Sequence, residues 1–282
     1  MSSHRWDGSR FVPLPGAVDE ARVLDVLLAE SWREVDGHVR ALEAHRDRFA
    51  ASLAGRASDA VGAPALGGGE GLDAAAIIDA AADLASLDGE WFPRVRIVVR
   101  DAGDETGREP GRERDATPIR EVLLDVRPGP PRQAEVAVAV RDPGDPRRRP
   151  RHKGPDLAWA GRQIASVRER GAGEVLVRDD AGAVLEAGWA SVLWWEGEDL
   201  CVPDPGLPVL PSITRALVEE RARAEGRTIR PVRAPLDALD GREAWLLNAY
   251  QGLRPVTRWV GSTITPGTPV RAAEWRAWLD SC

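Results

Sequence analysis

The chain has 282 residues, of which 43% are hydrophobic and 29% charged, values typical of a folded protein with one large or two medium domains. Its formal net charge is -7 and its isoelectric point about 5.3, which argues against charge-driven binding of nucleic acid. Its apolar stretches fall short of the ~20 residues that span a bilayer, and residues 1–7 lack the apolar region of a signal peptide. We therefore expect a cytoplasmic protein without nucleic-acid or membrane partners.

Cysteine and histidine give no sign of a disulfide framework or a metal site. Cys201 and Cys282 are the only two cysteines, and the four histidines show no metal-ligand spacing with them. Most of the eleven tryptophans are expected in the core or an interface, and a tryptophan among Trp189, Trp194 and Trp195 is a candidate for lining a pocket. The short arginine-rich run 147–151 is interpreted as a solvated loop.

The sequence pattern of the first half of the chain predicts a small α+β unit. Helices are predicted over 38–54, where Val39, Leu42, Phe49 and Leu53 share roughly one face, and over 72–86. Strands rich in branched residues are predicted over 94–100 and 119–127. The glycine-rich segments 67–71 and 102–118 are predicted loops.

Residues 127–132 (Arg-Pro-Gly-Pro-Pro-Arg) cannot continue a strand and are predicted to link two domains, 1–126 and 133–282. The second domain is predicted to be larger and mixed α/β. Its expected strands are 134–141, 174–178, 184–186, 191–195 and 244–248, and its expected helices are 156–170, 212–224 and 271–280.

Lysine occurs once in this chain, at Lys153, among 37 arginines. Arginine replaces lysine in most ion pairs, but it does not become a neutral amine or form a Schiff base. Composition alone leaves open whether Lys153 is a stray surface residue or a reacting amine.

Other residues suit pyridoxal phosphate, which needs a lysine, an acid facing its pyridine nitrogen and an anion site for its phosphate. Glu186 ends an apolar strand, Ser212 and Thr214 open a helix whose first N–H groups suit an anion, and Arg48 offers a counter-charge. Taken singly, each is better explained as a helix cap, a strand-end charge or a solvated arginine.

The order and spacing of these residues resemble the class IV aminotransferase family of pyridoxal-phosphate enzymes. Four segments carry the resemblance over most of the chain. They are Glu30-Ser-Trp-Arg33 through Asp36-Gly37 to Leu42–Arg48 ("E-T-x-R…D-G…L-x-x-H-x-x-R"), Leu185–Trp194 ("E-G-x-x-x-N-x-F"), Leu210-Pro-Ser-Ile-Thr-Arg215 ("L-P-G-I-T-R") and 248–256 ("N-x-x-x-G-x-x-P-V").

The resemblance implies the two-domain fold type IV, with a small N-terminal α/β domain and a larger, β-barrel-like α/β domain. It implies a homodimer and pyridoxal 5'-phosphate as cofactor. Lys153 would form the Schiff base and move the proton at the substrate α-carbon. The remaining cofactor-binding residues implied are Glu186 at the pyridine nitrogen, Arg48, Ser212, Ile213 and Thr214 at the phosphate, and Asn248 and Ala249 beside phosphate and substrate.

The sequence departs from the family pattern around the substrate. Ser212 replaces a glycine, Ser191 an asparagine, Ala158 a tyrosine and Ala249 a threonine, and residues 23–30 differ from the usual "Y-G-D-G-x-F-E". An aminotransferase acting on an amino acid and a 2-oxo acid is the first hypothesis. The alternatives are a 4-amino-4-deoxychorismate lyase, which the pair Asn248-Ala249 favours, and a degenerate member without catalysis.

Overall fold

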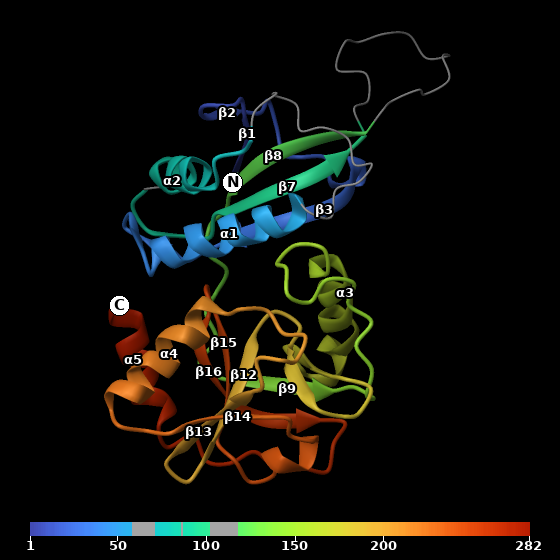
Figure 1. The fold of residues 1–282 in the computed structure, drawn as a ribbon, viewed down its shortest axis with the longest axis vertical. Helices are drawn as coiled ribbons and strands as arrows, with labels where there is room; N and C mark the ends of the chain where they lie inside the picture. Colours follow the sequence, from blue (N-terminus) through green and yellow to red (C-terminus); the bar gives the residue numbers. More distant parts are fainter. Residues whose placement is uncertain (58–70, 86, 102–117) are drawn as a thin grey trace. The chain divides into compact units, whose positions relative to one another are not determined.

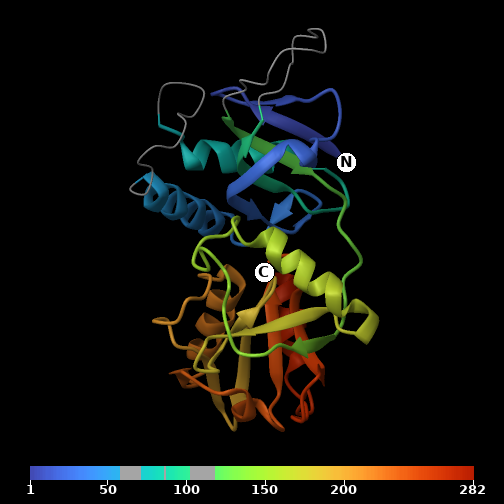
Figure 2. The ribbon, with the colours of Figure 1, turned by 90° about the vertical axis from the view of Figure 1, so that its right-hand side faces the viewer.

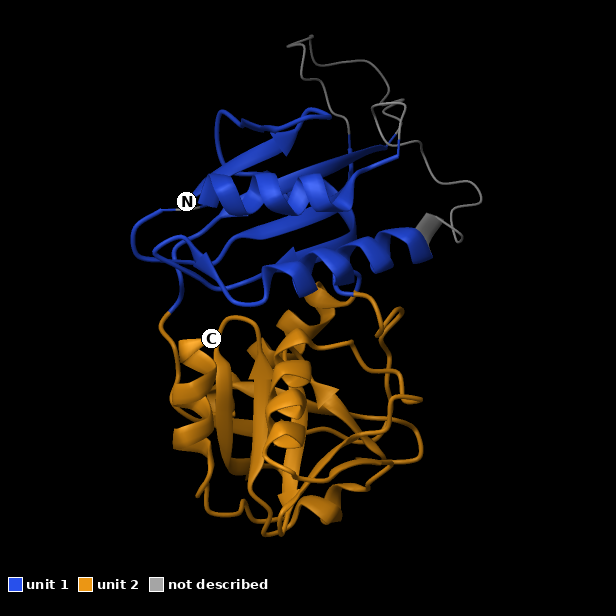
Figure 3. Cartoon of the chain, turned by 60° about the vertical axis from the view of Figure 1, so that its left-hand side comes forward, with its two compact units in different colours: residues 1–130, 153–155 blue, residues 131–152, 156–282 orange. Residues whose placement is uncertain are grey.

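The computed structural model describes residues 1–57, 71–85, 87–101 and 118–282. The predicted loops at 67–71 and 102–118 lie outside this part of the chain, apart from Gly71 and Pro118. The chain divides into two compact units, which Figure 3 colours separately. The first unit is Met1–Pro130 with Lys153–Pro155, and the second is Pro131–His152 with Asp156–Cys282. The change at Pro130 falls inside the predicted linker, whereas residues 153–155 group with the first unit.

The first unit contains an antiparallel sheet in the order β2-β1-β8-β7-β3 (Figure 1). Its strands are β1 (Ser2–Trp6), β2 (Phe11–Pro13), β3 (Val23–Ser31), β7 (Arg94–Arg100) and β8 (Ile119–Val126). A small sheet joins β4 (Glu34–Val35), β5 (His38–Val39) and β6 (Glu90–Trp91), and the helices are α1 (Leu42–Ala57) and α2 (Ala74–Ala85). The predicted strands at 94–100 and 119–127 and the predicted helix at 72–86 are thus confirmed.

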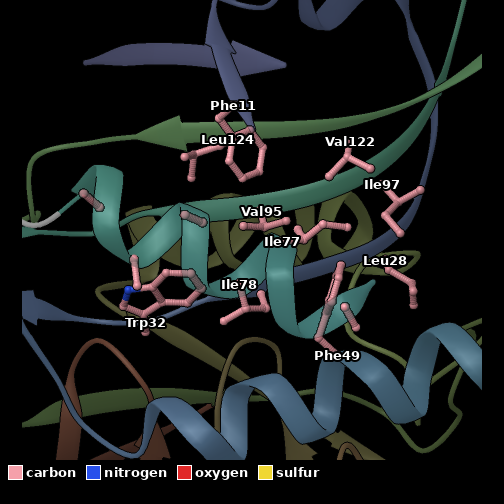
Figure 4. Close-up of a cluster of buried hydrophobic side chains, with 14 of the residues drawn as sticks. Phe11, Leu28, Trp32, Phe49, Ile77, Ile78, Val95, Ile97, Val122 and Leu124 are labelled. Atoms are coloured by element: carbon pink, nitrogen blue, oxygen red, sulfur yellow. The ribbon is translucent and has the colours of Figure 1, made fainter. Parts of the chain in front are cut away.

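The two faces of β7 and β8 differ because side chains alternate along a strand. One face packs against the helices, and Figure 4 shows Val95 and Leu124 in this core with Ile77 of α2 and Phe49 of α1. Ile77 is fully buried, so truncating it to alanine would cost about 2–5 kcal/mol. The opposite face carries buried ion pairs that centre on Asp125.

The predicted start of the first helix is wrong by four residues. Residues 38–39 form strand β5, and Ala41 has φ 52°, in the left-handed region that an α-helix cannot include. The helix therefore begins at Leu42, although Val39 still packs against the same core. Strand β3 was not predicted, because Leu27, Leu28 and Ala29 are all buried and two bulges interrupt the period-2 pattern.

The second unit contains an eight-stranded mixed sheet in the order β11-β10-β9-β16-β15-β12-β13-β14. The strands are β9 (Val136–Val140), β10 (Glu174–Arg178), β11 (Val184–Ala187), β12 (Ser191–Glu196), β13 (Asp199–Pro203), β14 (Ile229–Val232), β15 (Ala244–Asn248) and β16 (Gly252–Val260). The helices are α3 (Leu157–Val167), α4 (Ile213–Ala224) and α5 (Ala272–Ser281). All predicted elements of this domain are confirmed to within three residues at each end, whereas β14 and β16 were not predicted.

This sheet curls so that one face forms an inner core. Trp194 and Leu246 pack together in that core, while their neighbours Trp195 and Trp245 face the other way, against α4 and α5. Edge strand β11 meets the segment that follows the other edge strand, β14, because the Val184 N–H donates to the Ala234 carbonyl at 2.8 Å. The barrel-like domain implied by the resemblance is therefore confirmed, with α3 packed along the outside of β10 (Figure 2).

Among the described helices, none combines the length and apolar character that a membrane crossing requires.

Candidate active site

Backbone contacts hold Lys153 against strand β3, to which it does not itself belong. The Ala29 N–H donates to the Lys153 carbonyl at 2.8 Å. The following residue, Gly154, has φ +136°, and a Cβ atom there would lie 2.8 Å from the Leu28 Cα. Only glycine meets both conditions without strain, since L side chains rarely adopt this φ and the nearby atoms are backbone. Gly154 thus lets the chain bring Lys153 against β3.

The Lys153 amine lies between a hydroxyl and a buried carboxylate. Its Nζ donates to Ser31 Oγ at 2.8 Å and lies 3.9 Å from Glu30 Oε1, with 18% of the side chain exposed. Burial lowers the pKa of Lys153 to about 8, against the opposing charge of Glu30 and with help from Arg48 and Arg127. A neutral fraction of the amine therefore exists near neutral pH, as a nucleophile or base requires.

Glu30 holds Arg48, the residue predicted to bind phosphate. The Arg48 Nε donates to Glu30 Oε2 at 3.0 Å and its Nη2 to Oε1 at 2.5 Å. His45, one helical turn before Arg48 on α1, adds a bond from Nδ1 to Oε1 at 2.9 Å. Burial opposes ionisation of Glu30, but the charges of Arg48 and Lys153 and the bond from His45 hold its pKa well below the usual range. Glu30 is therefore a carboxylate at neutral pH.

Glu186, on β11, has a different environment. It is 5% exposed, forms an ion pair with Arg147 and accepts from the Leu210 N–H at 3.2 Å. Burial raises the pKa of Glu186 to about 7, although Arg147 opposes this rise. Asp145 and the Pro208 carbonyl hold the Arg147 guanidinium at 2.7 and 2.9 Å. The interpretation of the arginine-rich run as solvated is wrong for Arg147, whose side chain is only 8% exposed.

The start of α4 has the geometry predicted for a capped helix. The Ser212 side chain accepts from the Arg215 N–H at 3.2 Å, and Thr214 is buried. The first N–H groups of an α-helix have no acceptor within the helix, so those of Ile213 and Thr214 suit an anion.

Asn248 ends β15, and Ala249 begins the turn that joins β15 to β16. The Asn248 side-chain oxygen accepts from the Gln251 N–H at 2.7 Å, which braces this turn. Trp189 is half exposed, whereas Trp194 and Trp195 are buried in packed cores. Neither core tryptophan fits the expected pocket-lining role.

The structure brings Lys153 and Arg48 together on Glu30, whereas Glu186 has its own cluster with Arg147 and Leu210. Sequence reasoning missed five functional candidates, which are Glu30, Ser31, His45, Arg127 and Arg147. Glu30, Ser31 and His45 stand in the motif that identified Arg48, so the signal for them was present.

Arg127 lies in the first unit close enough to Lys153 to lower the pKa of the amine. Its Nε donates to the Phe92 carbonyl at 3.1 Å, and its guanidinium lies 4.4 Å from the Phe92 ring centroid. The Nη2 atom is buried and has no hydrogen-bond partner among the described residues. Burial, with Arg94 nearby, lowers the pKa of Arg127 to about 10, so the group remains a cation.

These donor and acceptor groups fit pyridoxal phosphate. The amine of Lys153 suits its aldehyde, the carboxyl of Glu186 suits its ring nitrogen, and Arg48 and the α4 N–H groups suit its phosphate.

Comparison with known proteins agrees with this chemistry. The model of the family described as amino-transferase class IV matches residues 27–259. No curated protein matches the chain significantly.

Solved structures match over nearly the whole chain. A hypothetical aminotransferase from Mycobacterium tuberculosis, with α-ketoglutarate and PMP bound, has a TM-score of 0.74 at 21% identity and covers 100% of this chain and 98% of that one. A branched-chain aminotransferase from Thermobaculum terrenum in its PLP form has 0.75 at 17%, covering 99% and 92%. A putative 4-amino-4-deoxychorismate lyase from Legionella pneumophila has 0.67 at 15%, covering 90% of each. These likenesses establish the fold, and the family match over most of the chain shows that it belongs to the class IV aminotransferases, enzymes that use pyridoxal phosphate.

Proposed function

We propose that this enzyme transfers an amino group between an amino acid and a 2-oxo acid, with Lys153 as its reacting amine. The observation that carries the proposal is the chain's single lysine, whose pKa is lowered to about 8 beside Ser31 and Glu30. When bound, pyridoxal phosphate supplies an aldehyde that combines with amines and a ring that accepts the electrons left at the α-carbon.

The residues have distinct proposed roles. Lys153 would hold the cofactor through its aldehyde carbon and, once a substrate amine had displaced it, its neutral amine would take up and return the proton at the substrate α-carbon. A base must be neutral to do this, and the lowered pKa of Lys153 provides that state. The Glu186 carboxylate would accept a hydrogen bond from the cofactor's pyridine nitrogen and so would keep that nitrogen protonated.

Anion binding is assigned to two kinds of group. Arg48 and the N–H groups of Ile213 and Thr214 bind the phosphate, with Ser212 holding the turn and Asn248 and Ala249 beside it. An amino acid brings a carboxylate of its own, and Arg127 is the proposed partner, because its buried Nη2 lacks an acceptor among the described residues. A guanidinium suits a carboxylate through parallel N–H···O bonds.

The test of this function is the visible spectrum of the purified protein with pyridoxal phosphate, before and after borohydride. We expect a cofactor band that borohydride fixes covalently in the wild type and not in Lys153→Ala. Addition of an amino acid should then convert the cofactor to its amine form, and a 2-oxo acid should restore it. Folded wild-type protein without any band would instead support the degenerate, non-catalytic alternative.

A second candidate function is the lyase reaction on 4-amino-4-deoxychorismate. Asn248 and Ala249 favour it by the resemblance stated above, and the Legionella pneumophila structure has the same fold. Release of pyruvate and 4-aminobenzoate without any oxo-acid acceptor would establish this reaction in place of transamination. Homodimer assembly and a cytoplasmic location stay predictions, which sedimentation and cell fractionation can test.

A further inference from the structure

One buried carboxylate, Glu30, receives an unusual concentration of groups in the first unit. It is 1% exposed, yet Arg48 contacts both of its oxygens and His45 contacts Oε1. The backbone N–H of Ser31 also donates to Oε1, at 3.0 Å. A buried carboxylate is strongly unfavourable unless it is paired and hydrogen-bonded, and Glu30 has both forms of support.

The contacts to Arg48 fix the direction of its guanidinium. Two adjacent donors, Nε and Nη2, meet the two oxygens of Glu30, so the planar group is held in a bidentate geometry. The Arg48 side chain is 11% exposed, so it is largely held within the first unit. An arginine on a 16-residue helix would otherwise be free to rotate about its side-chain bonds.

The amine of Lys153 interacts electrostatically with the Glu30 carboxylate without donating a hydrogen bond to it. Its Nζ lies 3.9 Å from Glu30 Oε1, and it donates instead to the hydroxyl of Ser31. Ser31 thus touches both partners, the carboxylate through its backbone and the amine through its side chain. The amine is electrostatically coupled to Glu30 but is free to leave it for another bond.

Three charged groups among the described residues act on the Lys153 amine. Arg48 and Arg127 act on the Lys153 amine as cations, and Glu30 acts as the anion. Burial lowers the pKa of His45, against the pull of Glu30, so His45 is a neutral hydrogen-bond donor and adds no charge near neutral pH. Burial lowers the pKa of the amine most, and the balance between one carboxylate and two guanidinium groups then shifts it further.

We propose that Glu30 is the shared counter-ion of Lys153 and Arg48, so that one buried carboxylate controls both the charge of the reacting amine and the direction of the guanidinium that faces the cofactor phosphate. The link to the phosphate rests on the proposed function, whereas the link between Glu30 and the amine concerns the cofactor-free protein. Glu30 is a positioning residue, because it acts through Lys153 and Arg48.

The chain offers a direct measurement, because it contains one lysine. Protein grown with lysine labelled with carbon-13 at Cε gives a single lysine resonance, and its chemical shift against pH reports the Lys153 titration without cofactor or catalysis. For the wild type we expect a midpoint near pH 8.

The shared counter-ion predicts shifts of opposite sign. Glu30→Gln removes the anion, so the midpoint should fall by about one pH unit or more. Arg48→Gln removes a cation from the same carboxylate, so the midpoint should rise. The double variant removes one charge of each sign and should return the midpoint toward the wild-type value. The double variant also leaves neither the Glu30 carboxylate nor the Arg48 guanidinium buried without its partner, so it can fold even if one of the single variants does not.

A matched control is Glu174→Gln in the second unit. Glu174 is 2% exposed and pairs with Arg254 at 3.2 Å, so its loss tests for general destabilisation. We expect it to leave the lysine midpoint unchanged. The proposal is wrong if Glu30→Gln leaves the midpoint within about 0.3 unit, if both single variants shift it in one direction, or if Glu174→Gln shifts it equally.

A second readout separates this inference from the proposed function. With pyridoxal, which lacks the phosphate, borohydride labelling of Lys153 at pH 7 should be faster in Glu30→Gln, because more of the amine is neutral. With pyridoxal phosphate this gain should be lost, because Arg48 is no longer oriented. If the lysine midpoints shift as expected but pyridoxal phosphate does not label the wild type, the proposed function is rejected and the counter-ion role is kept. If pyridoxal labels the wild type and Glu30→Gln at the same rate, the counter-ion role alone is rejected.

Discussion

Glu30 and Glu186 are both buried carboxylates beside an arginine, yet their acidities move in opposite directions. Arg48, Lys153 and His45 outweigh burial at Glu30 and hold its pKa below the usual range. At Glu186 burial prevails and raises the pKa to about 7, because Arg147 is shared with Asp145. An arginine contact therefore does not decide the charge of a buried acid, which depends on how many cations remain for it after competing acids are paired.

The difference also gives the two sites opposite dependence on pH. Glu30 stabilises the fold above the pKa it has in the unfolded chain, and this contribution is lost as the pH falls through its lower folded value. Glu186 behaves in the reverse way, because its folded value is higher than its unfolded one. Its contribution is present in acid and is lost as the pH rises toward about 7.

The largest expected effect comes from breaking the Lys153 cluster. Lys153→Arg keeps the positive charge beside Glu30 but removes the possibility of a neutral amine. Turnover should fall by about 10²–10⁴-fold or more, and borohydride should fix no cofactor. The measurement is single-turnover spectroscopy with an amino acid, with melting temperature as the check on folding. Retained turnover would show that Lys153 is not the reacting amine.

The next largest effect is expected at Gly154, which lets the Lys153 backbone pack against β3. Gly154→Ala places a methyl group 2.8 Å from the Leu28 Cα at a φ of +136°, so about 2–5 kcal/mol of unfolding free energy should be lost. Gly144→Ala is the matched control, because Gly144 has φ +127° but its nearest neighbour lies 3.7 Å away. That control should cost about 1–2 kcal/mol in urea unfolding. Equal losses would mean that backbone strain alone, and not the contact with β3, makes glycine necessary.

The difference in pKa between Glu186 and Glu30 should widen when Arg147, the cation beside Glu186, is removed. Arg147→Gln should raise the pKa of Glu186 above about 7, so the carboxyl stays protonated to higher pH. Cofactor affinity should then weaken most between pH 7 and 9, measured by spectral titration at each pH. Arg148→Gln, an exposed neighbour in the same run, should leave the profile unchanged. An unchanged profile in Arg147→Gln would show that the charge of Glu186 does not govern cofactor binding.

The smallest expected effect is at the α4 cap. Ser212→Ala removes the acceptor of the Arg215 N–H and should cost about 1 kcal/mol, whereas Ser212→Gly should cost only a few tenths. Thermal unfolding of the two variants measures the difference. A cofactor affinity that falls tenfold or more in Ser212→Gly would assign Ser212 to the phosphate itself.

Local patterns predicted the second unit better than the first. Strands β10 and β15 alternate or run apolar between clear turn residues, so their bounds follow from composition. Strand β3 lacks such a pattern, because its bulges put consecutive residues into the core. The start of α1 depends on the left-handed Ala41, which has no signature in that residue type.

For the site, motifs predicted which residues matter but not what they touch. Lys153, Glu186 and Arg48 came from their spacing in the family pattern, and their assigned roles stay predictions. The partnership of Lys153 with Ser31 and Glu30 joins residues more than 120 positions apart, so only the fold reveals it. The prediction for Arg147 was wrong because a run of arginines indicates solvent exposure, whereas this side chain is buried and forms ion pairs with Asp145 and Glu186.

The contacts of Lys153–Pro155 have a consequence for how this chain can be divided. These three residues belong with the first unit, while the chain on both sides of them belongs with the second. A fragment that stops at Pro130 would leave the Ala29 N–H without its acceptor and would lack the only lysine. Split proteins or domain exchanges that cut the chain once between Pro130 and Lys153 would therefore separate Lys153, the proposed reacting residue, from the strand that holds it.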